Sequence, residues 1–156
     1  MQTNNLNPKA FLRVIRVLYF AIIAGLLIFL SVTLFISSKT LYFNIDTKDP
    51  FTFVVLITIV IIPVGTLFSE RIFKRYKPNS TLKDKLPVYN LGLIIRLAIY
   101  EAAGLFSIVC LLISSNLYFV IFAAIAFSAI ILNYPSPEKI GEAINLTTSE
   151  IESLAK

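Results

Sequence analysis

One acidic side chain lies deep inside an apolar stretch of this sequence, and it is the residue best suited to chemistry. Glu101 is followed by two alanines and Gly104. A carboxylate at the centre of a membrane costs about 2.5 kcal/mol or more, so it must be paired, hydrated or protonated. Arg96 lies about 140° away around the helix, too far for an easy pair, and is expected to extend toward the membrane surface.

Three other positions are expected at the depth of Glu101. Counting at about 1.5 Å per residue places Gly25, Pro63 and Ser128 at this level in neighbouring helices. Pro63 frees a carbonyl of the preceding turn, and a neutral carboxyl could donate to it. These four residues are predicted to form a membrane-buried polar layer, either a packed structural knot or a wetted ion site.

The composition argues against catalysis. The sequence has no histidine and one cysteine, Cys110, which excludes a Cys/His metal cluster and an internal disulfide. It has no phosphate-binding glycine loop and no nucleophile–base pair. We therefore expect no catalytic residue, no metal and no cofactor, and we do not expect an enzyme.

The hydropathy of the chain places these residues in a bilayer. Apolar residues make up 57% and charged residues 15%, against about 25% charged in a soluble domain. Mean hydropathy is +0.82. Uncharged runs of 22, 20 and 36 residues follow Arg16, Asp49 and Glu101. A span needs about 20 apolar residues, and continuous runs indicate helices, not strands.

We predict an all-α integral membrane protein in which four transmembrane helices form an antiparallel bundle. The turn Ser114–Asn116 predicts a tight hairpin between the last two helices. The transmembrane domain is expected at residues 1–135, with spans at about 17–38, 50–69, 94–113 and 117–135.

The C-terminal tail, residues 136–156, is predicted to form short amphipathic cytoplasmic helices. Ser136 and Pro137 are typical of a helix start, and Thr147–Glu150 is a capping box. The tail is expected either to pack on its own membrane domain as a cap or to offer a docking site to another protein.

Basic residues set the predicted orientation. Nine fall before the first span or between the second and third spans, and two fall between the first and second. The positive-inside rule then places both termini in the cytoplasm, most simply at a bacterial inner membrane. The net charge of +5 is assigned to anionic lipid headgroups and not to nucleic acid. The predicted headgroup contacts are Arg71, Lys74, Arg75 and Lys77.

The stretch Ala98–Val109 resembles the carboxylate-bearing helix of ATP-synthase proteolipid (c) subunits. Both have a membrane Glu followed by small residues, a glycine and an apolar run. The resemblance implies that Glu101 binds a proton in an oligomeric ring, and it covers 12 of 156 residues. The chain as a whole is similar to small uncharacterised bacterial four-span membrane proteins, in its segments 93–101, 114–119 and 135–147.

Two functions are compatible with this pattern. The first is a non-catalytic accessory, assembly or regulatory membrane subunit, whose partner is another membrane protein. The second is a small oligomeric proton-coupled carrier or channel, in which Glu101 is the proton switch. The predicted partners are therefore the lipid bilayer and its anionic headgroups, together with another membrane protein or further copies of this chain.

Overall fold

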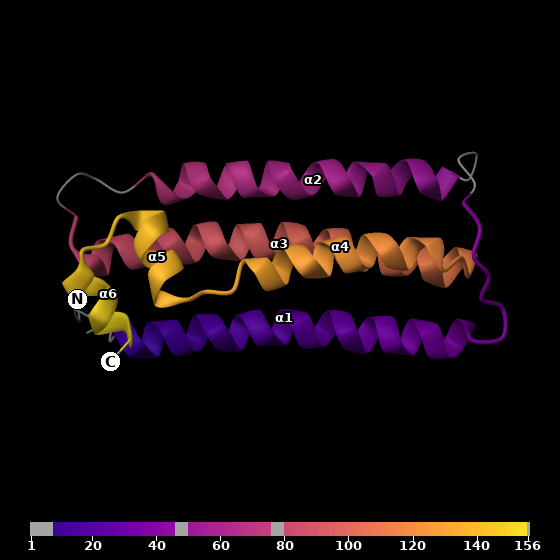
Figure 1. The fold of residues 1–156 in the computed structure, drawn as a ribbon, viewed down its shortest axis with the longest axis horizontal. Coiled ribbons are helices and arrows are strands. Elements are labelled where there is room, and N and C mark those ends of the chain that lie inside the picture. Colours follow the sequence, from indigo (N-terminus) through magenta and orange to yellow (C-terminus); the bar gives the residue numbers. More distant parts are fainter. Residues whose placement is uncertain (1–7, 46–49, 76–79, 156) are drawn as a thin grey trace, which may run out of the picture.

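Six helices account for most of the chain in the computed structural model, which describes residues 8–45, 50–75 and 80–155 (Figure 1). These ranges contain no β-strand, only an isolated bridge between Tyr42 and Asn116. The all-α prediction is therefore confirmed. The helices are α1 (Pro8–Ser37), α2 (Pro50–Phe73), α3 (Leu82–Ser114), α4 (Tyr118–Leu132), α5 (Pro137–Ile144) and α6 (Thr148–Ala155).

The helix α3 is the centre of the arrangement. It packs against α1, α2 and α4, and also touches α5. The helices α1, α2 and α3 run lengthwise beside one another, and successive long helices begin at alternating ends of the molecule (Figure 1). The short helices α5 and α6 lie at the same end as the start of α1 and of α3.

Helix length identifies the candidate membrane spans. In the described residues, α1 and α3 are long and apolar enough to cross a bilayer, and the bent pair α4–α5 would supply a third span if it is counted as one. The pair is bent by 84°. At about 1.5 Å per residue, the 15 residues of α4 reach about 22 Å, less than a hydrocarbon core of about 30 Å.

Helix boundaries differ from the expected spans in each of the four long helices. The helix α1 begins at Pro8, not near residue 17, and α2 ends at Phe73, not near residue 69. The helix α3 begins at Leu82, not near residue 94, because Asp84 accepts hydrogen bonds from the Thr81 N–H at 3.2 Å and the Thr81 hydroxyl at 2.7 Å. The helix α4 ends at Leu132 instead of about residue 135. Hydropathy therefore located the apolar part of each helix, and local hydrogen bonding set its ends.

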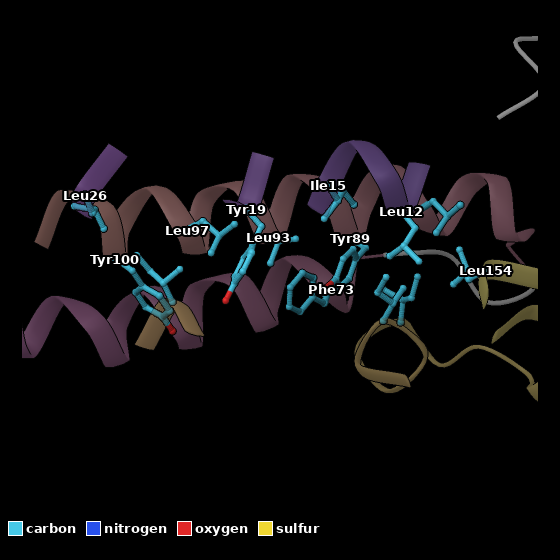
Figure 2. Packing of buried hydrophobic residues seen from close by; sticks show 14 of the residues in the cluster. Leu12, Ile15, Tyr19, Leu26, Phe73, Tyr89, Leu93, Leu97, Tyr100 and Leu154 are labelled. Atoms are coloured by element: carbon cyan, nitrogen blue, oxygen red, sulfur yellow. The ribbon is translucent and has the colours of Figure 1, made fainter. Parts of the chain in front are cut away.

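The main hydrophobic core follows the interface between α1 and α3 and continues into the tail. Figure 2 shows its side chains in one row, from Leu26 and Tyr100 to Leu12 and Leu154. In α5, Ile140 is fully buried. The tail is therefore part of the packed structure and not a separate appendage.

A polar clasp holds the opposite end of the molecule. Ser115 adopts the left-handed conformation (φ 57°) that ends α3. The Asn116 side chain is buried; its oxygen accepts from the N–H groups of Asn44 and Tyr118 at 3.1 Å, and its amide donates to the Asn44 carbonyl at 2.8 Å. The predicted hairpin is confirmed, and the segment after α1 is fixed to it.

Candidate functional site

The predicted polar layer does not form a packed knot within one chain. Gly25, Pro63 and Ser128 each lie on an exposed part of their helices. A Cβ added to Gly25 would meet nothing within 4 Å. The Ser128 hydroxyl donates to the Ala124 carbonyl of its own helix at 2.8 Å. The depth count did not specify which way each residue faces around its helix axis.

Glu101 is half-buried in α3, and no polar partner for it lies within residues 8–45, 50–75 and 80–155. Among the described residues, its carboxylate makes no hydrogen bond or ion pair. One turn away, a Cβ on Gly104 would lie 3.2 Å from a Leu26 methyl group and 3.6 Å from the Ala126 Cβ. The small size of Gly104 therefore lets side chains of α1 and α4 approach α3 closely at this position.

The polar centre of the structure is Arg96, not Glu101. Its side chain is 13% exposed. Its Nε donates to the Ser69 hydroxyl oxygen at 2.6 Å, and its Nη1 donates to the Asn133 Oδ1 at 2.7 Å. Its Nη2 donates to the Thr66 carbonyl at 3.4 Å and lies 3.8 Å from a Glu70 carboxylate oxygen. The expected extension of Arg96 to the surface is replaced by contacts that join α2, α3 and the end of α4.

The groups around Arg96 are themselves held in place. The Ser69 hydroxyl donates to the Thr66 carbonyl at 2.7 Å, so its oxygen is left to accept from the guanidinium. The Asn133 amide donates to the Ala129 carbonyl at 2.8 Å, which directs its oxygen toward Arg96. Sequence reasoning missed Ser69 and Asn133. The available signal was a polar residue at the C-terminal end of each of two apolar runs, residues 50–69 and 117–135.

Aromatic packing completes this region. The Arg96 guanidinium lies 5.0 Å from the centroid of the Phe73 ring, within the range of a cation–π contact. Phe73 also stacks on Tyr89, with ring centroids 5.2 Å apart. A Cβ on Gly92 would overlap the Phe73 ring, so a glycine is required where α2 presents this ring to α3.

A cleft of about 410 Å³ opens beside Arg96. Its walls come from α2, α3, the end of α4 and α5. The charged lining includes cations and anions together, so the cleft suits a zwitterionic group or a salt-bridging protein segment better than a simple anion. The lining is Glu70, Phe73, Lys74, Arg96, Leu132, Asn133, Lys139, Glu142 and Ala143.

A second, smaller hollow is apolar. It has a volume of about 130 Å³ and lies between α1, α3 and α4, beside Gly104. Its other walls are aliphatic side chains, two alanines and Phe127. Such a surface suits a hydrocarbon group and offers no polar contact to a carboxylate or an ion.

Three of the four predicted headgroup contacts are described by the structure. Arg71, Lys74 and Arg75 are exposed at the C-terminal end of α2. Lys77 lies outside the described residues. In Figure 1 this end of α2 is the end at which α5 and α6 lie. Headgroup binding by these residues stays a prediction.

The tail is tied to the membrane domain by the predicted caps and by Lys85. The Ser136 side chain accepts from the Lys139 N–H, which starts α5, and the Glu150 carboxylate accepts from the Thr147 N–H at 2.8 Å, which starts α6. Lys85 of α3 donates to the Asn145 carbonyl at 3.0 Å and lies 3.9 Å from Glu150. Both predicted cap motifs are confirmed.

No protein-family model, curated protein or solved structure matches this chain. In the part of the chain that the structure describes, no three His, Cys, Asp or Glu side chains are grouped so as to hold a metal ion. A functional proposal therefore rests on the residues and their geometry.

Replacing Asn133 by alanine should destabilise the fold. The change removes one acceptor from a guanidinium that is largely buried, and a lost partner of a buried charged donor costs about 1–3 kcal/mol. The midpoint of thermal unfolding, followed by far-ultraviolet circular dichroism in detergent, should fall. Asn90→Ala is the matched control, since Asn90 lies in α3 and takes no part in this cluster. Equal midpoints for the two variants would contradict the assignment.

Docking of α6 should weaken in acid. The pKa of Glu150 lies below its ordinary value. It is lowered by hydrogen bonds from the Thr147 N–H and the Thr147 hydroxyl, and by the nearby Lys85 charge. The ionised carboxylate therefore stabilises the folded state above the unfolded pKa, and this contribution is lost as pH falls through the lower folded pKa. Amide hydrogen exchange in α6, corrected for intrinsic rates, should rise below about pH 4. Glu150→Gln should abolish this extra acid sensitivity; if the variant kept it, another group would be responsible.

Proposed function

We propose that this chain is a four-span protein of a bacterial inner membrane with both termini in the cytoplasm. The alternating ends at which successive long helices begin support an antiparallel bundle of α1 to α4 (Figure 1). The 24 residues of α2 suffice for a span. The short α4 would cross with local thinning of the bilayer. The exposed Arg71, Lys74 and Arg75 support a cytoplasmic location for this end of the bundle.

Within that membrane, we propose a non-catalytic accessory, assembly or regulatory subunit that binds another membrane protein. The most extensive polar cluster, around Arg96, is used to join the chain's own helices. A binding role is supported by α1, whose surface is largely unburied and carries Phe35 at 82% exposure.

One observation carries this proposal: Ala21 and Gly25 form an exposed pair of small residues four positions apart on α1. Pairs with this spacing let two membrane helices approach closely and pack through their backbones. Gly25 has open space where a side chain would be, so its small size is not needed inside this chain. A helix of a partner protein would use that space.

Replacing Gly25 by leucine should therefore remove the partner and leave the fold intact. The chain is purified from its native membranes in a mild detergent, and co-purifying proteins are quantified by mass spectrometry. Ser31→Leu is the control, because Ser31 is another small exposed residue on α1 about 120° around the helix. We expect at least a tenfold loss of one heterologous membrane protein in Gly25→Leu only, equivalent to about 1.4 kcal/mol.

Self-association is measured separately, by co-purification of two differently tagged copies of the chain that are expressed together. If Gly25→Leu disrupts only self-association, the face is a homo-oligomer contact and the accessory proposal fails. If neither association changes, the small-residue pair has no binding role.

The second proposed function is a small oligomeric proton-coupled carrier or channel. The observation that favours it is the half-buried Glu101 carboxylate, which has no partner among the described residues. Hydrophobic carbodiimides modify protonated carboxyls that lipid can reach. Under this function, the carbodiimide should label Glu101, because the carboxyl must be reachable and must exchange its proton.

Glu101→Gln separates the two functions. An accessory subunit should keep its partner after the change, because the neutral amide has nearly the same shape. A carrier should lose proton-coupled uptake in proteoliposomes while remaining folded and oligomeric. Carbodiimide labelling that disappears in Glu101→Gln would identify the modified residue.

A further inference from the structure

We propose that a groove at the cytoplasmic start of α1 binds one anionic phospholipid, with its phosphate between Arg13 and Arg16 and an acyl chain along Val17 and Phe20. The groove has a volume of about 380 Å³. Its walls combine the first turns of α1 with Leu154 of α6. The inference rests on the membrane placement proposed above and does not depend on the accessory role.

The two arginines supply the charge that selects an anion. They lie three residues apart and so share one face of α1. Arg13 is exposed, and among the described residues it has no hydrogen bond or ion pair. Lys9 also lines the groove but already interacts within the chain, so the binding charge is assigned to Arg13 and Arg16.

Arg16 is held ready at the floor of the groove. Its guanidinium lies 5.4 Å from the centroid of the Tyr134 ring, and its Nε is buried with no acceptor among the described residues. The carboxylate of Glu138 interacts electrostatically with the Arg16 charge. The pKa of Glu138 is lowered mainly by hydrogen bonds from its own N–H and from Ser136, and further by Arg16. The two side chains form no ion pair in the described structure, so Glu138 leaves the guanidinium able to bind an external anion.

The apolar end of the groove distinguishes a lipid from a free phosphate. Val17 is 64% and Phe20 56% exposed, and both lie farther along α1 toward the apolar part of the helix. Phe20 packs edge-to-face on Tyr19 and tilted on Tyr134, with ring centroids 5.4 and 6.2 Å apart. Aromatic rings at the headgroup level with a cation one turn away match the two ends of a phospholipid.

Native mass spectrometry of the full chain in detergent tests the groove. The probes are phosphatidylglycerol and phosphatidylcholine, added at equal concentration. We expect one tightly retained phosphatidylglycerol and no selective retention of phosphatidylcholine. Arg13→Gln should lower phosphatidylglycerol retention on the order of tenfold, as expected for one charge-assisted contact. Lys83→Gln is the matched control, because it removes one exposed cation that lies outside the groove and is not one of the predicted headgroup contacts.

A competitor and a second variant distinguish a lipid site from diffuse attraction to charge and from a bare anion site. Equal losses in Arg13→Gln and Lys83→Gln would show diffuse attraction and overturn the site. Displacement of the lipid by inorganic phosphate would show a bare anion site and overturn the lipid assignment. Val17→Ser should weaken retention of phosphatidylglycerol without a change in helicity; unchanged retention would also count against an acyl contact.

The membrane placement has a separate readout. Native membranes are washed with alkaline carbonate, which releases peripheral proteins and leaves integral ones. If the chain is released, the proposed membrane topology fails. If the chain stays in the membrane and shows no preference for phosphatidylglycerol, only the groove fails.

Discussion

The arrangement of the end of the bundle that carries α5 depends on one guanidinium that is largely removed from water. Arg96 carries a charge next to a membrane core, and its donors must find acceptors within the protein. The sequence supplies them from the ends of two other helices, through Ser69, Thr66 and Asn133. Because these bonds have short lengths and fixed directions, they set the register of α2 against α3 and the point where α4 stops.

The break after α4 follows from that constraint. Asn133 ends the helix while its oxygen faces Arg96, and Lys139 donates to the Leu132 carbonyl at 2.6 Å. A carbonyl at the C-terminal end of a helix has no donor within the helix, and a lysine can supply one. The positive charge of the lysine also interacts favourably with the negative end of the helix dipole. The chain then turns by 84° into α5, which brings Ile140 into the core. The placement of the tail is therefore linked to the placement of Arg96.

Hydropathy and cap motifs could predict the helices but not their rotations. Long apolar runs located the helices, and the motifs at Ser136 and Thr147 located α5 and α6, because both signals are local. The facing of Gly25 and Ser128 depends on which neighbours each helix selects, and depth alone does not specify this. Arg96 was expected at the surface because its acceptors are 27 and 37 residues away in sequence, a separation that no local pattern encodes.

Three charged residues of the membrane domain differ in what surrounds them, and their roles differ accordingly. Arg96 has protein acceptors on several sides and therefore stabilises the fold. Arg16 lies over Tyr134 and lines a groove that continues into exposed apolar side chains, so an external anion with a hydrocarbon chain complements it. Glu101 has no partner among the described residues and lies close to an apolar hollow at Gly104. A carboxyl in that position is open to a group from outside the chain, and this makes it the point at which the two proposed functions differ.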